Sequence, residues 1–435
     1  MNEIMEKASN IIRKHKDYEL EFFGSKCNSL ICNMRLGKVH SVNSSVSGGI
    51  GVKAIVKGLA GFSYTTDLSH VEKTIRQAIA NSKNSQLKQK TFPTATKSQP
   101  VKGIYDKETA ELSSDSVMRI SVQLLDKFKS IDSKLEVSEA VFDVSLSDYF
   151  LVNTNELQGC ARLTDCSAFC STIYKGSNGD AMAESNSVKM LNMDKIVQRA
   201  SNFAINGLGA KPVSSKIQTV VLDADVLESL FGHTLYPSLN ADRVRKGQSV
   251  LEDKLGTKIA SSCLTVFDDG RLEYGLVSSP FDRDGVSALR TEIISGGVLK
   301  NFMYNYSTAE QESTVSTGNG AGGFNKISSI SPTNFVVARG DSSFDNIISE
   351  IKDGIIIYEV LGAHTSNPIT GDFSLAVAKG FKIVNGSIAH PVKNAMFTGN
   401  VFDLLKNVSV IGNDVRQRGH LVSPTISFEN QKIVG

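Results

Sequence analysis

Two stretches of this chain, residues 1–82 and 115–205, repeat one order of elements: a helical pattern, then strand-like runs, then a second helical pattern. The strand-like runs, residues 18–64 and 135–174, are rich in Val, Ile and Phe and are broken at turns such as Leu36-Gly37-Lys38. Such runs joined by short turns form antiparallel sheets, and an amphipathic helix covers its apolar stripe against a sheet. The sequence therefore predicts an N-terminal α+β domain with helices on an antiparallel sheet, built by a weak internal duplication.

The helices of these stretches carry recognisable signals. Ser69 is followed three residues later by Glu72, a capping-box pattern, and Asn192 is a candidate cap for the helix after it. A further helix is expected from about residue 116 to 128. The first helix shows an apolar stripe of Ile4, Met5, Ala8, Ile11 and Ile12.

Two segments divide the chain. Residues 81–103 are polar, contain two prolines and show no period, so we expect a long exposed loop there. Residues 206–212 end a helix with glycines and a proline. The sequence therefore predicts an N-terminal α+β domain at residues 1–206 and a β-rich C-terminal domain at residues 213–435.

The C-terminal domain shows turn signals between apolar runs. Ser295-Gly296-Gly297 and Asn385-Gly386 are typical of hairpin turns. One convincing helical pattern runs from about Asp225 to Tyr236, and we expect Pro237 to end that helix.

Composition argues against several classes of protein. The 47 Lys and Arg residues against 45 Asp and Glu give a net charge of +2, whereas a nucleic-acid binder shows a concentrated basic excess. No apolar run approaches the roughly 20 residues of a membrane helix, and the first residues lack the apolar core of a secretion signal. The six cysteines form no CxxC pair, so we expect a reduced, cytoplasmic protein.

Several residue groups could carry chemistry. Four aspartates could form a Ca²⁺ or Mg²⁺ site or an acid–base pair, but each pair precedes or brackets a glycine, which favours turn residues; they are Asp268, Asp269, Asp282 and Asp284. Three cysteines suit no common zinc spacing, and at least two are predicted to be packing residues; they are Cys160, Cys166 and Cys170.

The glycine-rich segment from Gly318 to Gly323 formally matches GxGxxG. A dinucleotide site would need a helix directly after it, and residues 324–328 show no helical period. We interpret it as a flexible loop whose backbone can approach a bound chain closely. A mobile linker is the open alternative.

An ordered set of short motifs runs through the C-terminal domain. They are Asp242-Arg243-Val244-Arg245-Lys246-Gly247-Gln248-Ser249, Asp268-Asp269-Gly270, Phe281-Asp282-Arg283-Asp284-Gly285, Gly297-Val298-Leu299-Lys300, Thr317-Gly318-Asn319-Gly320, Thr370-Gly371-Asp372-Phe373-Ser374 and Ile411-Gly412-Asn413-Asp414. In this order they resemble the TldD/PmbA family of peptidase-related proteins, and more closely its TldE (PmbA) branch. The resemblance implies a two-domain α+β protein and a TldD–TldE heterodimer that degrades or trims unfolded peptides.

In the TldD branch a helix carries HExxxH and a cysteine near the C-terminus completes a zinc site, where the glutamate takes a proton from the metal-bound water. Counted back without gaps from Lys246-Gly247-Gln248-Ser249, the three key positions fall on Gly232, His233 and Pro237. The last cysteine is Cys263, and Arg418-Gly419-His420-Leu421 stands where the thiolate would be. The resemblance therefore implies a non-catalytic subunit with no metal of its own, and zinc in a TldD-type partner.

His233 has a second interpretation, because a lone histidine at a helix end is commonly a hydrogen-bonded packing residue.

By the resemblance, the glycine-rich segment with Thr317, Gly318, Asn319 and Gly320 borders a peptide cleft. Asp372 could position a substrate backbone or form a tight turn. Two other functions stay open: an autonomous peptidase that acts as a homodimer, and a binding protein of the kind the family's gyrase-modulator label describes.

Overall fold

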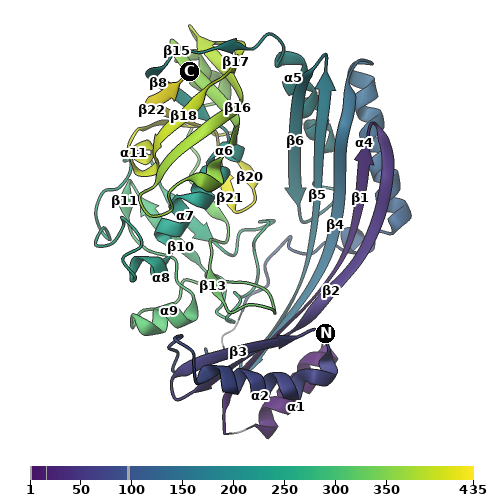
Figure 1. Ribbon diagram of the computed structural model, residues 1–435, viewed down its shortest axis with the longest axis vertical. Coiled ribbons are helices and arrows are strands. Elements are labelled where there is room, and N and C mark those ends of the chain that lie inside the picture. Colours follow the sequence, from purple (N-terminus) through teal and green to yellow (C-terminus); the bar gives the residue numbers. More distant parts are fainter. Residues whose placement is uncertain (1, 16, 96–97) are drawn as a thin grey trace.

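Figure 1 shows the computed structural model of the chain, which describes residues 2–15, 17–95 and 98–435. The first half forms α1 (Asn2–Lys14), β1 (Glu19–Arg35), β2 (Lys38–Val56), β3 (Leu59–Thr65), η1 (Leu68–His70), α2 (Val71–Ser82), α3 (Lys107–Ala110), α4 (Ser114–Ile131), β4 (Glu136–Asn153), β5 (Gln158–Tyr174), β6 (Ser177–Ser185) and α5 (Met193–Asn206). The predicted repeat of element order is confirmed: α1, β1–β3 and α2 recur as α4, β4–β6 and α5. The side chain of Ile4 lies outside this description.

The six strands form one antiparallel sheet in the order β3-β2-β1-β4-β5-β6. The two copies of the motif therefore meet at its centre, where β1 pairs with β4 from Glu21 opposite Asn153 onward. Helices cover one face of the sheet, because Val117 and Phe128 of α4 are buried against strand residues such as Phe142. Figure 1 shows the opposite side of this sheet turned toward the C-terminal part of the chain.

Each copy of the motif places a glycine where a helix touches the sheet. A Cβ on Gly61 of β3 would lie 2.1 Å from the Ala78 carbonyl oxygen of α2. A Cβ on Gly179 of β6 would lie 2.0 Å from the Ala200 carbonyl oxygen of α5. Only a residue without a side chain allows the backbones to approach so closely.

One expected helix signal is wrong and another is confirmed. The capping box at Ser69 is absent, because Asp67 caps the 3₁₀ turn η1, accepts from the Ser69 N–H and leaves α2 to start after His70. Asn192 does cap α5, accepting from the Lys195 N–H. Asp67 outcompetes Ser69 because its carboxylate satisfies the free N–H groups two residues on.

The segment between the two copies of the motif is not the wholly exposed loop expected for residues 81–103; residues 96–97 lie outside the description. Phe92 is fully buried, with Ile55 and Ala60. The N–H groups of Lys90 and Thr91 donate to the Glu310 carboxylate. One aromatic residue in a polar segment thus anchors it, because burying a phenyl group is worth about 2–3 kcal/mol.

The second half contains short helices and many strands. They are β7 (Lys211–Pro212), β8 (Lys216–Leu222), α6 (Ala224–His233), α7 (Leu235–Leu239), α8 (Ala241–Val244), β9 (Val266–Asp269), β10 (Arg290–Ser295), β11 (Val298–Leu299), α9 (Tyr306–Gln311), β12 (Gly320–Ala321), β13 (Ser329–Ile330), β14 (Phe335–Val337), α10 (Phe344–Ser349), β15 (Asp353–Leu361), η2 (Ala363–Thr365), β16 (Asp372–Val384), β17 (Ser387–Lys393), β18 (Met396–Asn400), α11 (Val401–Lys406), β19 (Val408–Ile411), β20 (Arg416–Arg418), β21 (Leu421–Ser423) and β22 (Ile426–Val434). The expected α+β fold with a β-rich C-terminal part is confirmed.

Two larger sheets organise this half. One has the order β15-β8-β22-β18-β16-β17-β7, and β15 also pairs with β16. The other has the order β11-β10-β9-β14-β21-β20. Both predicted hairpins are present, at Ser295-Gly296-Gly297 and at Asn385-Gly386, where both turn residues have positive φ. No helix in the described part of the chain is long and apolar enough to cross a membrane.

The helix expected from Asp225 to Tyr236 is interrupted. Helix α6 ends at His233, Thr234 leaves helical geometry at φ −128° and ψ −64°, and Pro237 lies inside the short helix α7. Proline is tolerated there because N–H groups in the first turn of a helix have no intrahelical partner. Gly232, His233 and Pro237 therefore do not lie on one helix.

Candidate functional site

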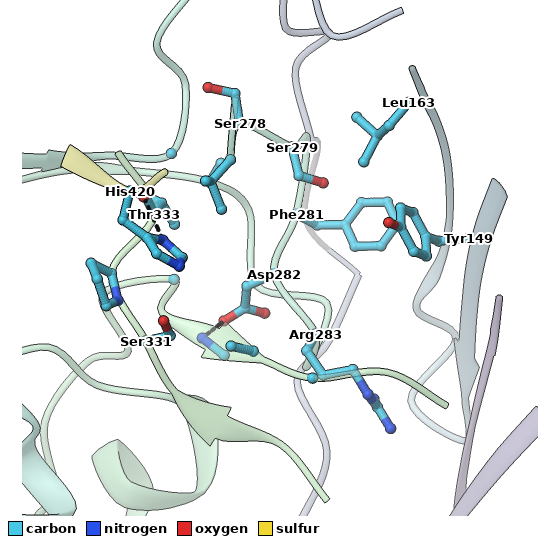
Figure 2. A pocket seen from close by; sticks show the side chains of 18 of the residues that line it. Tyr149, Leu163, Ser278, Ser279, Phe281, Asp282, Arg283, Ser331, Thr333 and His420 are labelled. Atoms are coloured by element: carbon cyan, nitrogen blue, oxygen red, sulfur yellow. Dashed lines mark hydrogen bonds between the residues drawn. The ribbon is translucent and has the colours of Figure 1, made fainter. Parts of the chain in front are cut away.

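A cavity of about 290 Å³ lies at the junction of the two halves, and we call it the junction cavity. Its residues come from the N-terminal sheet and from loops and strands of the C-terminal half (Figure 2). One side is mainly apolar, with Phe23, Tyr149, Leu163 and Phe281. The other carries polar groups and the glycine-rich segment, with Asp282, Ser331, Thr333, His420, Gly318 and Gly320 among its residues.

The loop that follows Phe281 supplies the carboxylate of the cavity. Asp282 accepts the N–H groups of Asp284 and Val286 at Oδ1 and that of Gly320 at Oδ2, each at 2.8–2.9 Å. Burial, and then the neighbouring Asp284 carboxylate, raise the pKa of Asp282 to about 8. Asp282 is thus the turn residue that the sequence predicts, and it also faces the cavity (Figure 2).

Asp284 belongs to a buried group of four charges below the cavity. The Lys53 ammonium lies 3.3 Å from Asp284 Oδ1 and 3.6 Å from Glu21 Oε1. Arg283 lies 3.1 Å from Glu21 Oε1 and stacks its guanidinium 4.0 Å from the centre of the Phe23 ring. Burial opposes ionisation of Asp284, but the charges of Lys53 and Arg283 outweigh it and lower its pKa. Two cations and two anions balance, so the group is electrically neutral.

Asp268 also departs from the expected turn role. It lies in strand β9, is 1% exposed, and accepts hydrogen bonds from the N–H and the Oγ1 hydroxyl of Thr333 and from the Asn319 side-chain amide. Burial raises the pKa of Asp268 to about 6. Asp269 is the turn residue of this pair, accepting from the Arg271 N–H. The expected Asp268–Asp269 and Asp282–Asp284 pairs thus each divide into one turn residue and one residue with distant partners.

The glycine-rich segment is anchored rather than flexible. Asn319 is 1% exposed and donates to Asp268 and to the Ser331 carbonyl oxygen. Thr317 donates to Asn319, and Gly320 starts the short strand β12, which pairs with β13. Of the residues assigned to a peptide cleft, Gly318 and Gly320 line the junction cavity, whereas Thr317 and Asn319 hold the segment in place.

His420 is a cavity residue that the sequence did not single out as a site. Its Nδ1 lies 3.1 Å from the Thr333 carbonyl oxygen, so the neutral ring carries its proton on Nδ1 and leaves Nε2 as an acceptor. No described residue forms a hydrogen bond with Nε2. Figure 2 shows the ring turned into the same space that Asp282 faces.

Helix α6 lies directly behind His420. Glu228 accepts the Tyr236 hydroxyl at Oε2 over 2.6 Å and the His420 backbone N–H at Oε1 over 3.1 Å. Glu228 and His233 are five positions apart, the spacing of the two histidines in HExxxH. This register differs from the gap-free count back from Lys246, which places the motif on Gly232, His233 and Pro237. His233 is exposed at the end of the helix, so its interpretation as a packing residue is wrong.

The remaining predicted residues lie elsewhere. Asp372 is exposed at the start of β16, where it accepts from Thr370 and Asn400, and it does not line the junction cavity. Cys166 and Cys170 are fully buried, which confirms them as packing residues, whereas Cys160 is exposed. Among the described residues, no three His, Cys, Asp or Glu side chains are grouped so that they could hold a metal ion.

A second, wider cavity of about 910 Å³ extends from β6 and α5 to β16, β17 and β20. We call it the β6 cavity. Strand β6 is the last in its sheet and, in the described part of the chain, pairs only with β5. Glu184 of β6 bridges to Arg418 of β20 at 2.6 Å, and His390 of β17 lines the same cavity.

Comparisons with known proteins agree across the length of the chain. Residues 214–435 match the model of the PmbA/TldA metallopeptidase C-terminal domain, and residues 20–82 match domain 1 of the same metallopeptidases. An uncharacterized protein of Methanocaldococcus jannaschii is 30% identical over 99% of both chains. The metalloprotease PmbA of Escherichia coli O157:H7 is 26% identical, over 94% of this chain and 91% of that one.

Two solved structures share the fold. A putative modulator of a DNA gyrase from Thermotoga maritima is 26% identical, with a TM-score of 0.91 and 100% of both chains covered. TldE from Thermococcus kodakarensis is 23% identical, with a TM-score of 0.90 over 98% of this chain and 100% of that one.

Proposed function

Because this chain belongs to the TldD/PmbA family of metallopeptidases, in its TldE (PmbA) branch, we propose that it is the subunit of a two-chain peptidase that carries no catalytic metal. Its partner is a TldD-type chain that holds the zinc. The substrate of the pair is an unfolded peptide. All six cysteines are free, which supports a reducing compartment such as the cytoplasm.

The hydrogen bonds that occupy the Glu228 carboxylate are the observation that carries this proposal. When His233 is taken as the second histidine of the motif, the first ligand place falls on Glu228, and both oxygens of Glu228 are already engaged, by the Tyr236 hydroxyl and the His420 N–H. The next position, where the motif has its glutamate, is Ser229, which cannot act as a general base. Only His233 of the motif remains.

The residues of this chain do not fit a zinc site. Zinc in a peptidase needs three protein ligands around an open position. His233 is a single exposed imidazole, and the C-terminal segment offers His420 in place of a thiolate. The His420 ring is bonded to the Thr333 carbonyl oxygen and faces the junction cavity, so it does not complete a set with α6.

The chain contributes surfaces to the peptidase instead of a metal. The junction cavity lies against the face of the N-terminal sheet that carries Phe23, Tyr149 and Leu163. The β6 cavity lies at the edge of the same sheet, along strand β6. A strand edge pairs with the backbone of an extended peptide whatever its side chains, which gives broad substrate choice. The free edge of β6 is suited to such pairing.

Co-expression with a TldD-type relative tests the proposal. We expect a stable complex with one zinc per heterodimer, measured by metal analysis, and cleavage of unfolded casein that a chelator abolishes. Glu228→Gln in this chain keeps the shape of the side chain, because the amide oxygen can still accept the His420 N–H and the amide nitrogen can donate to the Tyr236 hydroxyl; it is expected to leave zinc content and cleavage unchanged. Replacing a motif histidine of the partner is the matched positive control, and it is expected to remove both.

Stoichiometric zinc in this chain alone would overturn the assignment of roles. Cleavage by the purified chain that persists in chelator would support the autonomous peptidase, and failure to form a complex would remove the partner from the proposal.

A further inference from the structure

We propose that the junction cavity binds the amino-terminal residue of a peptide, with the α-ammonium group beside His420 and Asp282 and the first side chain against the apolar wall. This inference rests on the proposed function, because it specifies how the peptide of that function is held. It assigns a binding role to residues that the metal chemistry does not use.

Apart from the Arg283 guanidinium, the polar side chains that line the cavity can accept hydrogen bonds. His420 offers Nε2, because its Nδ1 proton is committed to the Thr333 carbonyl oxygen. Asp282 accepts three backbone N–H groups, two at Oδ1 and one at Oδ2, and a carboxylate has about four lone-pair sites, so one remains at Oδ2. The hydroxyl of Ser331 has no hydrogen-bond partner among the described residues. Such a set selects a ligand that donates several hydrogen bonds.

The charges around the cavity favour a cation. Glu21 and Asp284 are balanced by Lys53 and Arg283. Asp282 has no ion-pair partner among the described residues, although the Asp284 carboxylate is close. An ionised carboxylate with no counter-charge is costly to bury, and the raised pKa of Asp282 keeps it protonated in the empty cavity. An ammonium group that enters the cavity supplies the missing counter-charge, so that Asp282 can release its proton and accept a hydrogen bond.

The size and the wall of the cavity indicate which ammonium group fits. At about 290 Å³ it is at the small end of ligand cavities, so one or two residues can enter. Figure 2 shows Tyr149, Leu163 and Phe281 together on the side away from His420. An α-ammonium group lies one carbon from the side chain that would contact this wall, whereas the thin stem of a lysine covers less of it.

The Arg283 guanidinium does not compete for this place. It lies on the ring of Phe23 and pairs with Glu21, and Figure 2 shows it pointing away from the space between Asp282 and His420. A peptide carboxylate would meet the acceptors described above and would be repelled. The cavity therefore distinguishes the two ends of a peptide.

Fluorescence anisotropy with the full chain tests the inference. The probe is the peptide Leu-Gly-Ser-Gly-Ser with fluorescein at its carboxyl end, compared with the same peptide acetylated at its amino end and with an acetylated peptide that begins with lysine. Loss of charge-assisted hydrogen bonds is expected to weaken binding of both acetylated peptides by about tenfold or more. Equal binding of the free and acetylated leucine peptides, or no binding of the free one, would overturn the inference; tight binding of the lysine peptide would do so in favour of a side-chain site.

Variants locate the site. His420→Ala and Ser331→Ala are each expected to weaken binding of the free-amino peptide, with the thermal unfolding midpoint as the check on folding. The control is His364→Ala, because His364 is an exposed histidine of the same half of the chain that lines neither the junction cavity nor the β6 cavity. An effect of His364→Ala equal to that of His420→Ala would place the peptide elsewhere. These measurements need no partner chain, so a failure of complex formation would not be mistaken for a failure here.

Discussion

The ammonium of Lys53 on strand β2 lies 3.3 Å from Asp284 Oδ1 in the C-terminal half, and both side chains are buried. The two residues are 231 positions apart in the chain. This ion pair, with Glu21 and Arg283, fixes the N-terminal sheet against the loop that lines the junction cavity. The cavity therefore exists only while the two halves stay together.

Replacing Lys53 by methionine is expected to destabilise the protein strongly. The variant leaves Glu21 and Asp284 buried with one cation between them, and breaking a buried ion pair costs about 3–5 kcal/mol. The free energy of unfolding in urea measures the effect. Lys127→Met is the control, because the Lys127–Asp194 pair is exposed and such pairs are worth about 0–1 kcal/mol. Equal losses in the two variants would contradict the structural role of Lys53.

Asp282 is expected to make stability depend on pH. Its pKa is raised in the folded protein, to about 8, against about 4 when unfolded. The folded state therefore holds a proton that the unfolded state loses, so the contribution of Asp282 is fully present below pH about 4 and is lost as the pH rises to about 8. The unfolding free energy of the wild type, minus that of Asp282→Asn, is therefore expected to fall as the pH rises from 5 to 8.

Asp372→Asn is the control for this pH series. Hydrogen bonds from Asn400 and Thr370 lower the pKa of Asp372, so its contribution is lost only as the pH falls below about 4. The difference between wild type and Asp372→Asn should be flat from pH 5 to 8. A flat difference for Asp282→Asn as well would show that Asp282 is ionised throughout.

Local signals predicted much of the fold. The Asn385-Gly386 turn, the cap at Asn192 and the repeated order of elements were readable because each depends on residues close together in the chain. The break at Thr234 was not, because the apolar residues after it continue a helical period and proline is tolerated where the new helix begins. The burial of Phe92 depends on contacts that a polar segment does not reveal.

The candidate site was predictable only in part. The glycine-rich segment and Asp282 stood out by their own motifs, but their roles depend on Lys53 and His420, which lie far away in the chain. His420 carried one signal, since it stands where the family resemblance expects a cysteine. No local pattern indicates that its ring turns toward Asp282.

Gly320 is expected to tolerate no side chain. A Cβ there would lie 2.7 Å from Asp282 Oδ2 and 2.9 Å from Asp284 Oδ2. Gly320→Ala must push the loop away, which we expect to cost about 1–3 kcal/mol and to weaken peptide binding in the junction cavity. Gly323→Ala is the control, because its Cβ would approach only the end of the Asn325 side chain, at 3.3 Å. Chemical denaturation of both variants measures the difference.

Gly61 and Gly179 are expected to be equally sensitive, because they occupy matching places in the two copies of the motif. Alanine at either position would force helix α2 or α5 off the sheet, at a cost of about 2 kcal/mol or more. Gly232→Ala serves as the control: a Cβ there has open space, and alanine favours a helix by up to about 1 kcal/mol. A neutral Gly179→Ala would contradict the close approach of α5 to β6.

The Tyr236 hydroxyl holds Glu228 at 2.6 Å, and removing it tests whether this carboxylate is structural. Tyr236 is 7% exposed, and hydrogen bonds to charged groups contribute about 1.5–3 kcal/mol, so we expect Tyr236→Phe to lower the unfolding free energy by that amount. Tyr304→Phe is matched to it, because the Tyr304 hydroxyl contacts the Glu312 carboxylate at 2.8 Å in an exposed position where water replaces the bond. Metal analysis of Tyr236→Phe should still find no zinc in this chain, since a freed Glu228 with one exposed histidine offers two ligands and zinc needs three.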